Sequence, residues 1–190
     1  MKRILGLTIA LLLLVGMAGI GTWAYFSDVE TSTGNVLAVG TLDLKTNDVD
    51  GVSQTILATD MQPGDTIGPE TIMLKNAGSL AGSNLDIAFT YIESDAGSNP
   101  INKSADDTAA TIEVITLKYD GSSLLASVGD SNLNGYSDIQ DLKNADLSGQ
   151  SGINALTSKV FEITIKARSN ISGDYQADGI TVTMTFTLNQ

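Results

Sequence analysis

The sequence predicts an all-β protein, a jelly-roll β-sandwich with one short helix and long loops. The first observation is the strict alternation of apolar and polar residues in several segments, most clearly in residues 180–188 and 161–168. The second is that Gly, Asn, Asp and Ser gather between these segments, as they do in turns. Many short strands separated by turns are typical of sandwiches and jelly rolls, and 190 residues suffice for one such domain.

The strands are expected where apolar residues recur at every second position. The last of them carries Thr181, Thr183, Thr185 and Thr187 on one face and only apolar residues on the other, which predicts a half-buried strand. Further strands are expected at residues 41–45, 71–75, 85–91, 112–119 and 161–168.

One helix is expected, from Asp138 to Leu147, because Ile139 and Leu142 fall on one side of it. Residues 148–152 are rich in Ser and Gly and are expected to form a turn. The segment from Ser94 to Thr111 has no clear periodicity and is expected to be the longest loop.

Residues 1–24 have the composition of a signal peptide. Lys2 and Arg3 form a basic start, residues 4–20 are almost wholly apolar, and a small residue, Ala24, ends the segment at an expected cleavage site. The alternative is an uncleaved membrane anchor, since the apolar run approaches the length of a transmembrane helix. Residues 25–190 are expected to form a single secreted domain, located outside the cell or at its surface.

The composition excludes several classes of function. The chain contains no His and no Cys, so zinc sites built from those residues, Ser-His-Asp or Cys-His nucleophiles and disulfides are all impossible. Ten basic residues face 22 acidic ones, for a formal net charge of −12. A nucleic-acid binder would need a basic patch, so no nucleic-acid partner is expected.

One segment has the spacing of a calcium-binding loop. Oxygen-bearing side chains occupy its positions 1, 3, 5, 9 and 12, Gly135 lies at the sharp turn, and position 7 would offer a backbone carbonyl. The expected calcium ligands are Asp130, Asn132, Asn134, Tyr136, Asp138 and Asp141. The alternative is an ordinary polar loop, because Asp, Asn and Gly are also the residues of turns.

Several short motifs, in order along the chain, resemble the TasA/camelysin family. Residues 21–28 look like the cleavage region of substrates of SipW-type signal peptidases. Residues 39–44 resemble the "AGTLDL" stretch of the family, residues 60–65 its "NLKPGD" turn, and residues 74–80 its "NNGSL" segment. The final strand at 180–188 also fits, whereas residues 95–155 show no such likeness.

This resemblance implies a secreted structural subunit of extracellular fibres or pili in a biofilm matrix. TasA-like subunits form matrix fibres, and related archaeal subunits form bundling pili. The implied partners are further copies of the same chain, paralogous fibre subunits, and a SipW-type signal peptidase for processing. In such fibres subunits join head to tail by donor-strand complementation, which assigns the donor strand to residues 25–35; the alternative is a mobile N-terminal tail.

The sequence favours a protein without enzymatic activity. Some members of the family are called metalloproteases, but an HExxH motif is impossible without His. Two other functions stay open: a monomeric calcium-stabilised binding module at the cell surface, and an accessory protein that anchors fibres made by a paralogue.

Overall fold

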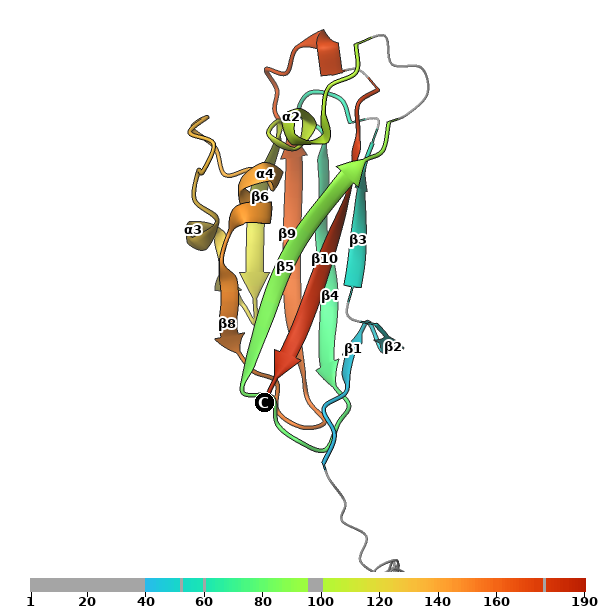
Figure 1. Ribbon diagram of the computed structural model, residues 1–190, viewed down its shortest axis with the longest axis vertical. Coiled ribbons are helices and arrows are strands. Elements are labelled where there is room, and N and C mark those ends of the chain that lie inside the picture. The colour runs from blue at the N-terminus through green and yellow to red at the C-terminus, as the bar shows by residue number, and fades with distance from the viewer. Residues whose placement is uncertain (1–39, 52, 60, 96–100, 176) are drawn as a thin grey trace, which may run out of the picture. The chain divides into compact units, whose positions relative to one another are not determined.

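The computed structural model describes residues 40–190 except for residues 52, 60, 96–100 and 176. The expected signal peptide at 1–24 and the expected donor strand at 25–35 lie outside the described residues. Within them, two antiparallel sheets face each other, which confirms the all-β sandwich (Figure 1).

The larger sheet has six strands in the order β2-β1-β4-β9-β6-β7. Its three long strands are β4, β9 and β6, with β9 in the centre between the other two. The bounds are β1 Leu44–Thr46, β2 Val49–Asp50, β4 Thr66–Asn76, β6 Ile112–Tyr119, β7 Ser122–Ser123 and β9 Ser158–Ala167.

The smaller sheet has four strands in the order β3-β10-β5-β8. Its long central strands are β10 and β5, paired over their whole length from Ile180↔Glu93 to Asn189↔Asn84. The bounds are β3 Ser53–Ala58, β5 Asn84–Glu93, β8 Leu147–Ser151 and β10 Ile180–Asn189.

The core lies between the two sheets and is built from the apolar half of each alternating pattern. On β9, Phe161, Ile163 and Ile165 are fully buried, while the residues between them are not. The ring of Phe161 contacts the rings of Phe89 on β5 and Phe186 on β10, with centroids 6.3 Å and 5.2 Å apart. These aromatic contacts join the two sheets.

Three short α-helices lie among the described residues, where the sequence predicted one. They are α2 (Ala105–Ala109), α3 (Leu125–Val128) and α4 (Ile139–Asn144), and a 3₁₀ turn, η2, spans Gly173–Tyr175. Helix α2 was missed because Ser94–Thr111 was expected to be loop throughout. Its N-cap is Ser104, whose hydroxyl accepts a hydrogen bond from the backbone N–H of Asp107.

Two expectations around α4 were wrong. The helix ends at Asn144 instead of Leu147, and Leu147 together with residues 148–151 of the expected turn forms the edge strand β8. The side chain of Leu147 is buried in the sandwich core, and this burial outweighs the low strand propensity of its Ser and Gly neighbours.

The first sheet strand is also shorter than expected, because only Leu44 and Lys45 of residues 41–45 fall in β1. The preceding residues instead bond to the loop after β4, with the carbonyl of Thr41 accepting from the N–H of Leu80. Strand β3 was not predicted.

Strand β3 covers only half of β10. It pairs with residues 180–185, and no described strand continues along the same side of residues 186–189. Near this end of β10, Gly82 lies against Leu188 and Gly40 lies against Leu80. The described chain therefore begins at the end of the sandwich where no described strand pairs with one side of β10.

Candidate functional site

The loop predicted to bind calcium joins α3 to α4. It begins after Gly129, which ends α3 with a positive φ of 73°. Within it, Leu133 and Gly135 have positive φ values of 58° and 87°, so the chain reverses sharply twice. Gly135 meets the requirement for glycine at the turn position, because it adopts this conformation without steric cost.

The carboxylate of Asp130 closes the first half of the loop. Its Oδ1 accepts the backbone N–H of Asn134 at 3.0 Å, and its Oδ2 accepts that of Gly135 at 2.9 Å. Both oxygens thus face the interior of the turn, as the first residue of a cation-binding loop would require.

The second half of the loop converges on Asp138, which is fully buried. Its Oδ2 accepts hydrogen bonds from the side-chain amides of Asn134 at 2.7 Å and Asn132 at 3.1 Å. The guanidinium of Arg168, from the end of β9, also donates to this oxygen at 2.9 Å. Three of the six expected ligands, Asn132, Asn134 and Asp138, therefore lie in one cluster with the guanidinium of Arg168, which the sequence did not indicate.

Asp138 and Asp141 together start α4. The side chain of Asp138 accepts the N–H of Asp141, and the side chain of Asp141 accepts the N–H of Asp138, which is a capping box. The other oxygen of Asp141 accepts from the backbone and hydroxyl of Ser131, at 2.7 Å and 2.8 Å. Two of the expected metal ligands, Asp138 and Asp141, therefore also cap the N-terminus of α4.

The two carboxyls differ in their pKa. Burial is the largest influence on Asp138 and raises its pKa, although hydrogen bonds from both Asn amides oppose this. Burial acts in the same direction on Asp141, but the hydrogen bonds from Ser131 and from backbone N–H groups outweigh it, so the pKa of Asp141 is lowered. Asp141 therefore loses its proton more readily than Asp138.

Tyr136 is the remaining predicted ligand. Its backbone N–H donates to the side-chain oxygen of Asn134, and the guanidinium of Arg168 stacks 3.9 Å from the centre of its ring. Arg168 thus binds both the loop's buried carboxylate and its aromatic side chain. No local pattern could reveal this, because Arg168 is 30 residues away from Asp138 in sequence.

The loop as described is held together by hydrogen bonds. Among the described residues, no three Asp or Glu side chains come close enough together to hold a metal ion. The amide nitrogens of Asn132 and Asn134 face Asp138, and rotation of both amides would present oxygens to it instead. Oxygens facing a carboxylate need a cation between them, so the residues fit calcium only after this local rearrangement.

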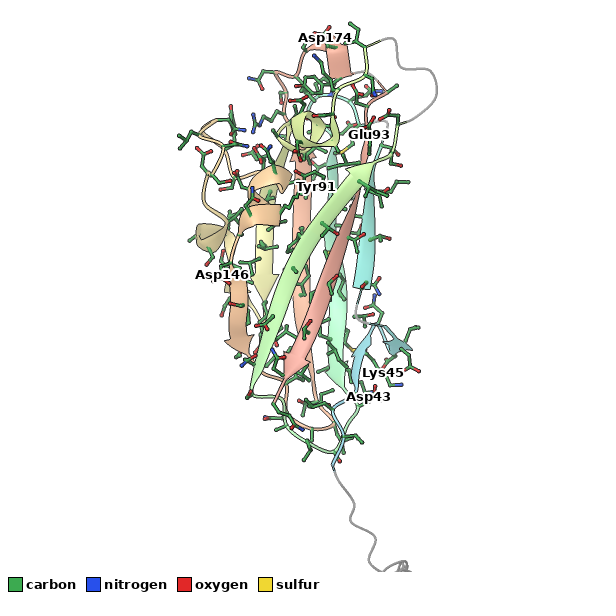
Figure 2. All side chains as sticks on the ribbon, viewed as in Figure 1. Asp43, Lys45, Tyr91, Glu93, Asp146 and Asp174 are labelled. Carbon is green, nitrogen blue, oxygen red and sulfur yellow. The ribbon has the colours of Figure 1, made fainter. Side chains whose placement is uncertain are left out.

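A second cluster of polar side chains lies where α2 and α4 meet β5. Tyr91 on β5 is labelled in Figure 2. Its hydroxyl donates to Asp106 at 2.5 Å, and the ammonium of Lys143 lies 3.4 Å from the same carboxylate and 4.6 Å from the Tyr91 ring. The Tyr91 hydrogen bond is the main reason that the pKa of Asp106 is lowered. These contacts anchor α2 and α4, and they include no group poised as a nucleophile.

The described part of the chain contains no helix that is both long and apolar enough to cross a membrane.

Taken together, the described residues form an antiparallel β-sandwich in which one inner strand, β10, is paired on one side over only half of its length, with a polar loop between α3 and α4. A family model described as camelysin metallo-endopeptidase matches residues 1–190, and the chain belongs to this family, as its motifs indicated. No curated protein matches the chain. The family description names a metal-dependent protease, whereas this chain has neither His nor Cys with which to bind zinc.

Proposed function

We propose that the protein is a secreted structural subunit of extracellular fibres or pili, which assembles head to tail by donor-strand complementation. Family membership supports this proposal, and the observation that carries it is the side of β10 at residues 186–189 with which no strand of the described residues pairs, called the free side below. Its cellular setting is then the biofilm matrix or the cell surface, after removal of residues 1–24 by a SipW-type signal peptidase.

The free side of β10 has the properties of an acceptor for an added strand. Phe186 is fully buried and Leu188 partly buried, so an incoming strand would extend a sheet whose inner face is already packed. Main-chain N–H and C=O groups along an open edge supply the affinity in this binding mode. Residues 25–35 of a neighbouring subunit are the donor in this proposal.

The proposal is tested by comparing residues 25–190 with residues 36–190 in negative-stain electron microscopy. We expect filaments with a regular repeat from the first and monomers from the second. A peptide of residues 25–35 should then raise the melting temperature of the shorter chain, while a scrambled peptide of the same composition should not. Equal filament formation by both chains would exclude the donor-strand mechanism.

The outcome also separates the alternative functions. Monomers from both chains would favour a binding module at the cell surface or an accessory subunit. The accessory subunit would still bind a paralogous fibre subunit, whereas the binding module would not.

Calcium binding by the loop at residues 130–141 is part of the proposal, with the six ligands named above. An ion that binds only the folded state must stabilise it, so calcium should raise the melting temperature and a chelator should reverse the rise. The expected affinity is weak, on the order of 10⁻⁴–10⁻³ M, as in extracellular modules.

Asp130→Asn is the sharpest variant for this test, because it removes the charge and keeps one side-chain oxygen as acceptor for the N–H of Asn134, at the expense of the contact with the N–H of Gly135. It should lose the calcium response while the chain stays folded. Asp43→Asn, which removes an exposed carboxylate outside the loop, is the matched control and should retain the response. The absence of any calcium effect on the unmodified chain would end the calcium proposal.

We also propose that the protein is not an enzyme, despite the family description. The lack of His and Cys supports this, as does the hydrogen-bonded role of the carboxylates in the described loop. Incubation of the purified chain with unfolded protein substrates and added Zn²⁺ should release no peptides above the level of a metal-only control. Peptide release that disappears with a chelator would overturn this point.

A further inference from the structure

The outward face of the smaller sheet is unusual in its chemistry. We call it the threonine face and define it as the side chains of β3, β10 and β5 that point away from the core. Its centre is the column of Thr181, Thr183, Thr185 and Thr187 on β10. Because Thr183 pairs with Thr55 on one side and Thr90 on the other, a row of three threonines crosses this column.

Large apolar side chains adjoin the threonines. Leu57 and Ile92 flank Thr181 in the same cross-strand row, and they are 58% and 68% exposed. Burial of such side chains is favourable, so an exposed pair beside small uncharged residues marks a surface suited to contact.

The threonine face is also almost without charge, in a chain whose formal net charge is −12. Among its described side chains the only charged one is Asp86, at the end of the face. That carboxylate already accepts hydrogen bonds from the N–H of Gly149 at 2.8 Å and the amide of Asn189 at 2.7 Å. Two copies of this acidic chain would therefore meet with little repulsion at this face.

We propose that the threonine face is a surface for lateral self-association, occupied by the same face of a second copy of this chain. A threonine hydroxyl both donates and accepts a hydrogen bond, so an array of threonines is complementary to itself. A two-fold contact places the same patch on both partners, which self-complementarity permits. The described face carries no cation for an anionic surface and no aromatic ring for a sugar, so other partners fit it less well.

The size of the face sets the strength of the contact. Three strands about 4.8 Å apart and four outward positions about 7 Å apart cover roughly 300 Å². A stable complex buries roughly 800 Å² per partner, so the isolated subunits should associate only weakly. A fibre repeats the face at every subunit, so many weak contacts together hold two fibres side by side. This part of the inference rests on the proposed fibre function.

The test uses the double variant Thr183→Lys/Thr185→Lys, which places two charges in the centre of the face. The matched control is Thr71→Lys/Thr164→Lys, which makes the same change at outward positions of β4 and β9 on the other sheet. Both variants lower the net negative charge equally, so reduced overall repulsion predicts more association in both. The proposal predicts less association in the first variant alone. Circular dichroism and melting curves should show that both variants fold.

Two readouts keep this proposal separate from the fibre proposal. Sedimentation equilibrium of the monomer near its solubility limit should show weak pairing of the wild type and the control, at least about tenfold weaker in the face variant. In fibre preparations, the face variant should give single filaments where the wild type gives laterally joined ones. If no filaments form, the fibre proposal fails, and the sedimentation equilibrium of the monomer alone tests the self-association of the threonine face.

Equal self-association of all three proteins would overturn the proposal. So would binding of the wild type to an insoluble polysaccharide that the face variant loses while its self-association stays unchanged. That result would assign the face to a carbohydrate surface.

Discussion

The outer faces of the two sheets share the same backbone arrangement but differ in the charge of their side chains. On the larger sheet, charged side chains alternate with small and apolar ones along β4, β9 and β6, including Lys75, Glu113, Lys118, Glu162 and Lys166. On the smaller sheet, the threonine face carries a single carboxylate over three strands. Both faces belong to strands of antiparallel sheets, so strand geometry does not explain the difference.

The difference indicates which surface of this acidic protein is suited to contact with another molecule. Interspersed charges of both signs keep the larger sheet hydrated and unsuited to tight packing. The threonine face lacks these charges and exposes Leu57 and Ile92. The contrast therefore separates a solvent-facing surface from one available for association.

The largest expected effect on the free energy of unfolding comes from the inner faces of the two sheets, which together form the core. Phe161→Ala should lower the free energy of unfolding by about 3–5 kcal/mol, because it empties a fully buried site between Phe89 and Phe186. Val160→Ala, one residue along β9 and facing outward at 39% exposure, should change it by less than about 1 kcal/mol. Urea unfolding followed by circular dichroism measures both. Similar losses of unfolding free energy in the two variants would mean that the outer face of β9 is packed as tightly as its inner face, and the larger sheet would then have no solvent-facing surface to compare with the threonine face.

A smaller effect is expected from the ion pairs of the larger sheet. Lys118 and Glu162 lie 3.3 Å apart on neighbouring strands, with side chains 44% and 35% exposed. Lys118→Gln should cost about 0.2–1 kcal/mol at low salt and nearly nothing in high salt, where the attraction is screened. The measurement is the free energy of unfolding in urea at the two salt concentrations. A loss that persists unchanged in high salt would show that Lys118 acts through packing.

The sequence predicted the parts of this fold that repeat a simple pattern, and it missed those that depend on distant residues. The strands at residues 112–119 and 180–188 were found because burial follows their two-residue period. Strand β8 was missed because one buried residue, Leu147, holds a Ser- and Gly-rich segment against β5. In the candidate site, the loop ligands could be named from their spacing, but Arg168 could not, because only the folded chain brings it to Asp138.

The smallest expected change in stability distinguishes the two outer faces most directly. Ile92→Thr on the threonine face and Ile115→Thr on the larger sheet keep a β-branched side chain, so each should alter the free energy of unfolding by less than about 0.5 kcal/mol. Retention of the monomer on a hydrophobic-interaction column should nevertheless fall more for Ile92→Thr.

Ile92 is 68% exposed and shares its row with exposed Leu57, whereas Ile115 is 41% exposed and lies between Glu113 and Lys118 along β6. A contiguous apolar patch binds the resin more strongly than an isolated side chain of the same type. Equal falls in retention would mean that the two faces present equivalent apolar surface, and the absence of charge alone would then have to account for any self-association.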